Sequence, residues 1–196
     1  MNEQSKISQT SIIHQNVYFI GQCEVGDGTE IFPNTTIENS KIGSGCIIKS
    51  SHIENSIVKN NVQIGTFAHL RPNSIIENNC KIGNFVEIKN STIGEQTKVS
   101  HLAYVGDADI GKNCNIGCGA IFVNYNGKTK QRTIVEEGCF IGSNCNIVAP
   151  VVIGKNAYIC AGTTLTVNTQ PFDFVVGRCR ETIKSGRAKN YLKEQI

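Results

Sequence analysis

The sequence contains no tryptophan and a single methionine among 196 residues, and its hydrophobic content of 39% is modest for one globular core. No apolar segment reaches the ~20 residues that a membrane-spanning helix needs, and the N-terminus lacks the basic start and apolar run of a signal peptide. The net charge is only +3, and no tract combines aromatic with basic residues as nucleic-acid binding would require. These absences predict a cytoplasmic protein that has no membrane span and does not bind nucleic acid.

A repeat runs through most of the chain. Aliphatic residues recur in steps of five or six from Val25 to Ile116, with Phe122 next, and then at five positions six apart from Ile141 to Leu165. The position after each aliphatic residue is often glycine, and the fifth position is small or β-branched. This hexapeptide pattern predicts an all-β chain, folded as a parallel β-helix with three flat faces whose first and fifth positions point inward.

The repeat also divides the chain. Residues 1–24 are predicted to be a lead-in with one partial rung, 25–170 the β-helix, and 171–196 a basic tail with a short helix. The rhythm fails once, so residues 123–135 are predicted to leave the prism as a loop. Open end rungs and flat apolar faces favour an oligomer that covers them.

The cysteines fit this frame better than they fit a disulfide or zinc site. Four of the nine occupy the inward fifth position, where a small hydrophobic residue packs well: Cys46, Cys80, Cys114 and Cys145. No CxxC pair occurs, and the close pair Cys114 and Cys118 has no histidine at zinc-finger spacing. Reduced, buried thiols are therefore expected.

No metal site is predicted. The histidines stand at positions 14, 52, 69 and 101, and a zinc centre built from them would need three to converge. His52 and His69 are one coil apart, but no third partner is expected near them. The motifs GxxxxGK[ST], GxGxxG and GxSxG are absent as well.

Three hexads make one coil, so residues 17 or 18 apart stack on the same face, about 4.8 Å apart along the axis. Arg71 and Lys89 become neighbours in this way, with no obvious acidic partner in their column. Two stacked cations repel each other unless an anion lies between them, which makes a phosphate group the natural ligand. The alternative is that both side chains splay apart into solvent.

The face that holds His101 gives a second candidate region. The members of its column, one per coil, are Asn84, His101 and Cys118, followed by Ser143 and Ala161 if the break in the repeat adds one loop within a single coil. Only small residues follow His101, which leaves a shallow groove of about 14 Å, comparable with an extended pantetheine arm. Arg178 and the basic tail lie at its upper end and suit nucleotide phosphates. The alternatives are a solvated histidine and small residues that merely suit a turn.

Polar residues are expected around this histidine from two directions. Tyr104 lies at the next corner, close to the two stacked cations, and Asn115 approaches from the opposite corner one coil higher. The predicted loop carries Asn124, Tyr125 and Lys130 within NYNGKTK, whose Asn-Gly pair favours a turn. Because binding residues often lie in loops on a rigid scaffold, these side chains are expected to reach a ligand or a neighbouring chain.

Several segments closely resemble a known family: GTFAHLRPNS, KIGNFVEIKNS, KVSHLAYVGDADIG, NIGCGAIFVNYNGKTK, FIGSNCNIVAPVVIG and AGTTLTV. They are similar to the C-terminal acetyltransferase half of the bacterial bifunctional N-acetylglucosamine-1-phosphate uridyltransferase/glucosamine-1-phosphate N-acetyltransferases. The resemblance covers about residues 20–180 and includes the interrupted loop. It implies a left-handed β-helix and a homotrimer with sites between subunits. It also implies acetyl transfer from acetyl-CoA to glucosamine 1-phosphate, a step toward UDP-N-acetylglucosamine and cell-wall precursors.

The resemblance also implies roles for individual residues. His101 matches the general base that takes a proton as the amine attacks the thioester directly, a task that suits an imidazole. Sugar-phosphate contacts match Arg71, Lys89, Tyr104, Asn115 and Lys130. Acetyl-CoA contacts match Cys118, Asn124, Tyr125, Ser143, Ala161 and Arg178.

Three departures from the family pattern bear on this interpretation. Cys118 stands where the family usually has alanine, and Asn126 replaces the usual aspartate of the loop. No uridyltransferase half precedes Met1, so the chain is expected to be either a stand-alone acetyltransferase or one half of a bifunctional enzyme. Two rival functions stay open: acetyl transfer to another amino sugar, and a non-catalytic β-helix that serves as a trimerisation or regulatory module.

Overall fold

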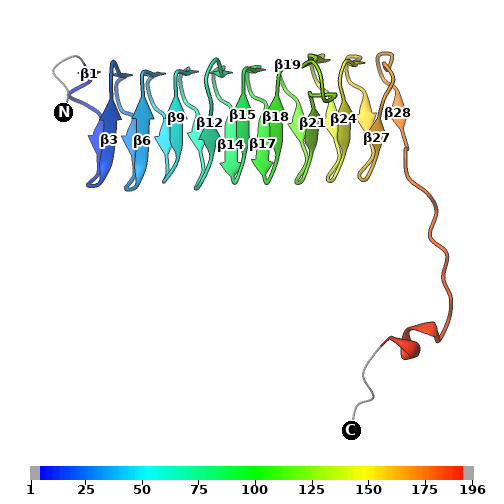
Figure 1. Cartoon of the computed structure of the whole chain (residues 1–196). Coiled ribbons are helices and arrows are strands. Elements are labelled where there is room, and N and C mark those ends of the chain that lie inside the picture. The colour runs from blue at the N-terminus through cyan, green and yellow to red at the C-terminus, as the bar shows by residue number, and fades with distance from the viewer. Residues whose placement is uncertain (1–4, 192–196) are drawn as a thin grey trace, which may run out of the picture.

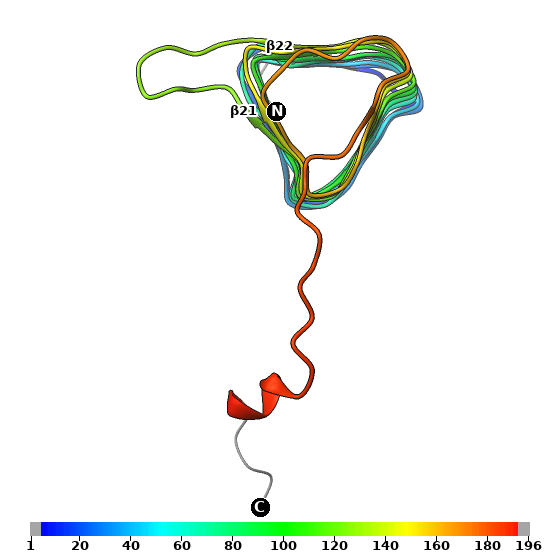
Figure 2. The same ribbon diagram turned by 90° about the vertical axis from the view of Figure 1, so that its right-hand side faces the viewer.

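The computed structural model describes residues 5–191, and most of them form a three-sided β-helix (Figure 1). Viewed along its axis, the chain traces a triangle, which one loop and the C-terminal segment leave (Figure 2). The sides of the triangle are three sheets of parallel strands. The predicted fold, an all-β, left-handed parallel β-helix of hexapeptide repeats, is confirmed.

The three sheets are called the first, second and third face. In the described residues, the first face has nine strands: β1 (Lys6–Ile7), β4 (Glu24–Val25), β7 (Lys41–Ile42), β10 (Ile57–Val58), β13 (Ile75–Ile76), β16 (Thr92–Ile93), β19 (Ala108–Ile110), β22 (Thr133–Val135) and β25 (Val152–Ile153). The second has ten: β2 (Ile12–Ile13), β5 (Glu30–Ile31), β8 (Ile47–Ile48), β11 (Gln63–Ile64), β14 (Lys81–Asn84), β17 (Lys98–His101), β20 (Asn115–Ile116), β23 (Phe140–Ile141), β26 (Tyr158–Ile159) and β28 (Phe174–Val175). The third has nine: β3 (Val17–Ile20), β6 (Thr35–Glu38), β9 (His52–Glu54), β12 (His69–Leu70), β15 (Glu87–Lys89), β18 (Tyr104–Gly106), β21 (Ile121–Val123), β24 (Asn146–Val148) and β27 (Thr164–Leu165).

Equivalent residues of successive coils stack in columns. Leu70 pairs with Ile88, and Ile88 pairs with Val105, so these inward side chains lie one above another. All three are fully buried. Burial of an aliphatic side chain of this size contributes about 1.5–3 kcal/mol, and the ladder of such residues forms one continuous core along the axis.

Residues in the left-handed backbone conformation make the corners of the prism. Asparagine accounts for eleven of the eighteen non-glycine residues with positive φ, because its short polar side chain tolerates this conformation. Phe67, Phe85 and Leu102 adopt it too, at successive coils of the corner between the second and third faces. Their side chains are exposed, so this corner is apolar where it runs beside His101.

The coil extends beyond the predicted boundaries at both ends. Strands β1, β2 and β3 pair with the next coil, so the β-helix begins at Lys6 and not at residue 25. Strand β28 pairs with β26, so the last rung ends at Val175 and not at residue 170. The short helix predicted in the tail is a single 3₁₀ turn, η1 (Arg187–Asn190). Within the described residues, no helix is long and apolar enough to cross a membrane.

The cysteines behave as their inward positions predict. Seven of the nine are buried, Cys118 and Cys179 are exposed, and all nine are free thiols. The four predicted inward cysteines are at most 2% exposed. Burial raises the pKa of the Cys80 thiol to about 11, which keeps it protonated and unreactive.

The predicted loop leaves the prism between β21 and β22 (Figure 2). It covers residues 124–132, which is shorter than the predicted 123–135 because Val123 ends β21 and residues 133–135 form β22. At its base, the Arg132 guanidinium donates to the Asp109 carboxylate, with Nε 2.6 Å from Oδ2. This ion pair holds the root of the loop against the first face.

Candidate active site

Arg71 and Lys89 lie side by side on the third face, as their spacing predicts. The Arg71 amide donates to the Ile88 carbonyl, which places Arg71 next to Lys89 in the following coil. Arg71 Nη1, however, donates to Glu87 Oε1 at 2.9 Å. Glu54 stands one coil below Arg71 in the same column, so the expectation of no acidic partner there was wrong. Glu87, by contrast, pairs with Arg71 diagonally from the adjacent column. Both side chains of this pair are 40% exposed, so it contributes little to stability and stays accessible to a ligand.

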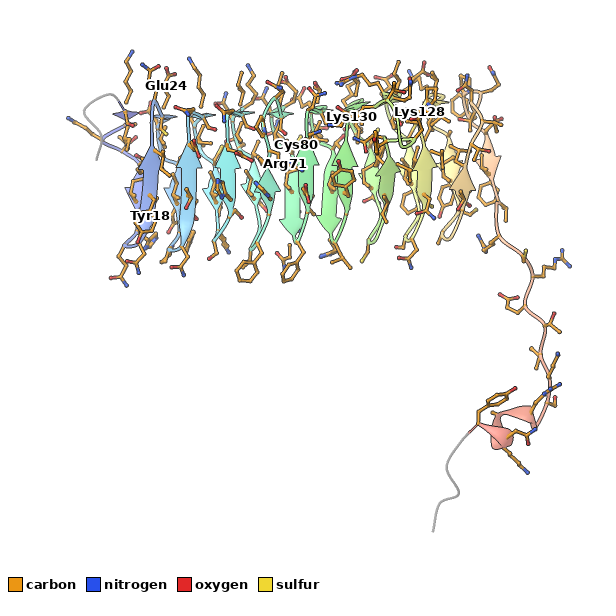
Figure 3. All side chains as sticks on the ribbon, viewed as in Figure 1. Tyr18, Glu24, Arg71, Cys80, Lys128 and Lys130 are labelled. Atoms are coloured by element: carbon orange, nitrogen blue, oxygen red, sulfur yellow. The ribbon has the colours of Figure 1, made fainter. Side chains whose placement is uncertain are left out.

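The ammonium group of Lys130, which belongs to the loop, lies close to that of Lys89. Lys130 and Arg71 are labelled in Figure 3. The closeness of Lys130 lowers the pKa of Lys89, and burial and the charge of Arg71 act in the same direction, while Asp107 opposes them. Each positive group here raises the free energy of the others. The cationic cluster (Arg71, Lys89 and Lys130) therefore has the electrostatics of an anion-binding site.

Asp107 connects this cluster to the loop. Asp107 is only 6% exposed, and its carboxylate accepts hydrogen bonds from the side-chain amides of Asn90 and Asn124. Burial raises the pKa of Asp107, but these two hydrogen bonds and the charges of Lys89 and Lys130 outweigh it, so the pKa lies below its ordinary value of 3.8. Asp107 thus stays ionised and fixes the side chain of Asn124.

Tyr104 belongs to the same group of side chains. Asn124 Nδ2 lies 3.5 Å from the Tyr104 hydroxyl. A Cβ added at Gly106 would lie 2.4 Å from that hydroxyl and 2.8 Å from Asn124 Nδ2. Gly106 therefore leaves the space in which both polar groups meet beside the cationic cluster.

His101 ends β17 at the corner between the second and third faces, and its side chain is exposed. It pairs with Asn84 of the coil below, as predicted. A hollow of about 410 Å³ on the second face is lined by His101, Asn84, Gly83 and residues of the lower coils. A Cβ at Gly83 would lie 1.7 Å from the Ser100 carbonyl oxygen, so this glycine permits the close approach of β14 and β17. This hollow extends below His101, whereas the predicted groove extends above it.

The small residues predicted above His101 do follow one another along a single corner. The Asn144 amide donates to the Cys118 carbonyl at 2.8 Å, and the Gly162 amide donates to the Ser143 carbonyl at 2.8 Å. Arg178 Nη1 donates to the Ala161 carbonyl at 3.1 Å. Cys118, Ser143, Ala161 and Arg178 therefore line one edge of the prism in that order.

Two of the predicted site residues lie apart from these groups. Asn115 begins β20 on the second face, between Lys98 and Phe140, at the end of the strand opposite to His101. Tyr125 is exposed, and its hydroxyl donates to the Gly127 carbonyl at 2.7 Å. In the described part of one chain, neither forms a hydrogen bond with the cationic cluster.

The asparagine that departs from the family pattern has a structural role. Asn126 Oδ1 accepts hydrogen bonds from the amides of Lys128 and Thr129 at 2.9 and 2.8 Å. An amide oxygen makes these bonds as a carboxylate oxygen would. The turn of the loop is therefore maintained without the charge.

Sequence reasoning missed four acidic residues: Glu87 and Asp107 near the predicted sites, and Glu38 and Glu54 near His52. Glu87 and Asp107 were overlooked, although Asp107 stands in a corner column otherwise occupied by Asn73 and Asn90, where an acid is a visible change. Near His52, no third histidine was expected, but the carboxylates of Glu38 and Glu54 approach it, with one ligand atom of each of the three residues within 4.8 Å of the other two. That expectation considered only histidines.

Comparison with known proteins identifies the family of the chain. The model of the GMPPB C-terminal domain matches residues 52–127, and that of the bacterial transferase hexapeptide (six repeats) matches residues 132–166. The bifunctional protein GlmU of Bacillus velezensis is 46% identical over 190 residues, 97% of this chain, and that of Caldicellulosiruptor saccharolyticus is 50% identical over 182 residues, 93% of it. The chain is a hexapeptide-repeat protein similar to GlmU. The resemblance seen in its motifs is thereby confirmed.

The GlmU relatives are longer proteins. The chain spans 42% of the first of these two and 39% of the second. Among solved structures, the UDP-N-acetylglucosamine acyltransferase of Francisella novicida matches with a TM-score of 0.50 at 16% identity, over 80% of this chain and 61% of that one. At this identity the match supports the fold alone.

Proposed function

We propose that the chain transfers acetyl from acetyl-CoA to the amine of glucosamine 1-phosphate and so makes N-acetylglucosamine 1-phosphate for UDP-N-acetylglucosamine synthesis. The observation that carries this proposal is the cationic cluster on the third face, gathered beside Tyr104 and Asn124. His101 lies at the corner where this face begins. A phosphate bound there would relieve the repulsion that lowers the pKa of Lys89. The similarity to GlmU along nearly the whole chain supports the same activity.

In the proposed reaction, His101 accepts the proton that the amine loses as its nitrogen attacks the thioester carbonyl. A C–N bond forms and the C–S bond breaks, without a covalent enzyme intermediate. The departing thiolate then takes the proton from His101, so that coenzyme A leaves as the thiol and the base is regenerated. The cationic cluster holds the phosphate, and Tyr104 and Asn115 hold the sugar. Positioning of the two reactants and general base catalysis together account for the acceleration.

Acetyl-CoA is proposed to lie along the corner above His101. Cys118, Ser143 and Ala161 are small enough to leave the edge of the prism open, and Arg178 follows at its upper end. Three coils along the axis span about 14 Å, a length that fits the pantetheine arm. From the loop, Tyr125 would contact the ligand after giving up its bond to Gly127, and Asn124 would contact it from beside Asp107.

A homotrimer is part of the proposal. Asn115 and Tyr125 lie apart from the cationic cluster in a single chain, so a site that uses all of the predicted residues requires a neighbouring subunit. Exposed apolar residues at the corner beside His101, such as Phe85 and Leu102, also suit a covered surface. The predicted cytoplasmic location fits the use of acetyl-CoA and stays a prediction.

A thiol-release assay with acetyl-CoA and glucosamine 1-phosphate tests the function. Wild-type chain should turn over, and His101→Ala should lower kcat by about 10²–10⁴-fold, the usual contribution of a general base. His14→Ala removes another surface imidazole, ion-paired with Glu30 and remote along the chain, and should keep full activity. No turnover by the wild type, or full turnover by His101→Ala, would refute the proposal.

Two further experiments with the wild-type chain distinguish the proposed function from its rivals. Glucosamine without phosphate and other amino sugars, supplied in place of glucosamine 1-phosphate, should react poorly if the cationic cluster selects a phosphorylated acceptor. Calorimetric titration with acetyl-CoA should detect binding in the enzyme, whereas a non-catalytic β-helix would give no heat of binding.

A further inference from the structure

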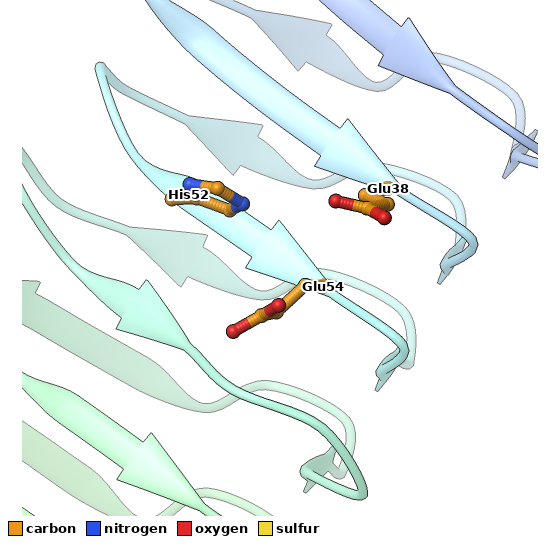
Figure 4. A group of neighbouring side chains, drawn as sticks. All are labelled: Glu38, His52 and Glu54. Atoms are coloured by element: carbon orange, nitrogen blue, oxygen red, sulfur yellow. The ribbon is translucent and has the colours of Figure 1, made fainter.

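A second group of polar side chains lies on the third face, below the cationic cluster. Glu38 ends β6, and His52 and Glu54 are the outward residues of β9 (Figure 4). His69 follows on β12. We infer that Glu38, His52 and Glu54 bind a divalent transition-metal ion of the Zn²⁺ type, with His69 orienting Glu54. Neither the resemblance nor the proposed acetyl transfer uses these residues.

The positions of the ligand atoms fit such an ion. One nitrogen or oxygen from each of Glu38, His52 and Glu54 lies within 4.8 Å of the other two. Ligand atoms 2.0–2.2 Å from a tetrahedral zinc ion are about 3.4 Å apart, so small rotations of side chains that project from the same face would close the set. The two glutamates pair directly across β6 and β9, which places the three ligands on adjacent coils of a rigid sheet.

The charges of the group call for a cation. Glu38 and Glu54 face each other in register, and like charges placed directly opposite are destabilising. Other glutamates of this surface have basic partners, such as Glu87 with Arg71. Within residues 5–191, Glu38 forms no ion pair, and Glu54 pairs only with His69, at 3.2 Å. A divalent ion between the glutamates would replace repulsion by attraction.

His69 supports the arrangement from the next coil. Its Nε2 donates to Glu54 Oε1 at 3.2 Å, and its ring lies 5.1 Å from the His52 ring, centroid to centroid. A group that hydrogen-bonds to a metal ligand fixes the ligand's orientation and strengthens binding. This contact leaves the second oxygen of Glu54 free to bind the ion.

The donor set selects the kind of metal. Imidazole suits Zn²⁺, Cu²⁺ and Ni²⁺, whereas Ca²⁺ and Mg²⁺ prefer six or more oxygen ligands. Three protein ligands leave at least one position for water. Glu54 lies one coil below Arg71 of the cationic cluster and two coils below Lys89. The ion would therefore clamp β6 to β9 next to the proposed phosphate site and not within it.

Competition titration with a chromophoric zinc chelator tests this site on the full chain. Cys118 and Cys179 are first alkylated with iodoacetamide in every sample, so that exposed thiols cannot hold the metal. The wild type should bind one Zn²⁺ per chain. His52→Asn and Glu54→Gln should each weaken binding by about 10-fold or more, and melting followed by circular dichroism should show that Zn²⁺ stabilises the wild type but not His52→Asn.

His14→Asn is the matched control. His14 also pairs with a glutamate, Glu30 at 2.8 Å, but belongs to no group of three ligand atoms in the described residues, so this variant should bind Zn²⁺ as the wild type does. Melting without metal shows whether each variant is folded. Absence of saturable binding, or equal affinity in the wild type and His52→Asn, would overturn the inference. Because catalysis is not the readout, either result is independent of the proposed acetyl transfer.

Discussion

Replacement of Asp107 by asparagine tests whether one buried carboxylate holds the loop to the third face. Asp107 has a positive φ of 49°, a conformation that asparagine also tolerates, so Asp107→Asn removes the charge without adding backbone strain. The carboxylate accepts hydrogen bonds from Asn90 and Asn124. In the variant, the neutral side-chain amide of the new asparagine takes the place of the carboxylate that accepts these two hydrogen bonds.

The expected loss follows from these contacts. Hydrogen bonds to a charged group contribute about 1.5–3 kcal/mol each, and neutral ones about 0.5–1.5 kcal/mol. Loss of the charge from two such bonds should therefore lower the free energy of unfolding by about 2 kcal/mol at pH 7. Glu77→Gln is the control, because the Glu77 side chain forms no hydrogen bond or ion pair within residues 5–191. It should change stability by less than about 0.5 kcal/mol.

The effect should depend on pH in a defined direction. The pKa of Asp107 is lower in the folded chain than its ordinary value of 3.8, so its contribution is complete above that value and is lost as the pH falls through the lower, folded pKa. Urea denaturation followed by circular dichroism at a series of pH values measures this. The wild type and Asp107→Asn should differ most near neutral pH and converge in strong acid. A difference that stays constant with pH, or a more stable variant, would refute the reasoning.

Other substitutions test the close approach of coils, the core and the thiols. In Gly83→Ala the added Cβ would lie 1.7 Å from a backbone oxygen, so this variant should lose about 1–3 kcal/mol of stability and show a lower kcat in the thiol-release assay. In Gly94→Ala the added Cβ would lie 2.5 Å from a backbone atom at another corner. This variant should also lose stability but keep its kcat per folded molecule. Ile88→Ala, which empties a fully buried position, should lower the free energy of unfolding by about 2–5 kcal/mol in urea titration. Iodoacetamide should add two groups to the native chain, at Cys118 and Cys179, and nine after unfolding, by mass spectrometry; more than two on the native chain would contradict the burial of the others.

The fold could be predicted because a β-helix converts sequence distance into spatial distance. Inward residues such as Leu70 and Ile88 recur at a nearly fixed offset, and parallel pairing holds them in one column. The same offset predicted Arg71 beside Lys89 and Ser143 beside Ala161. The step from Cys118 to Ser143 also required that the loop lie within one coil, as it does. Each of these statements concerns contacts within a single column.

Contacts between columns could not be predicted in this way. Arg71 reaches Glu87, and His69 reaches Glu54, on diagonals that depend on rotamers of long side chains. The position of Lys130 against Lys89 depends on the path of a loop with no repeat to define it. Glu87 was missed for this reason, whereas Glu54 stands 17 residues before Arg71 in the same column and could have been found from the spacing.

The spacing of the coils also sets how such a chain can lengthen. Val58 pairs with Ile76, one coil later, so a tandem duplication of residues 59–76 would add one coil and leave every flanking pair in register. It would move Glu38 about 4.8 Å farther from Lys89 without altering the neighbours of either residue. Distances between surface sites on this scaffold therefore change by gene duplication in fixed steps, whereas in a globular core the same insertion would have to be repacked.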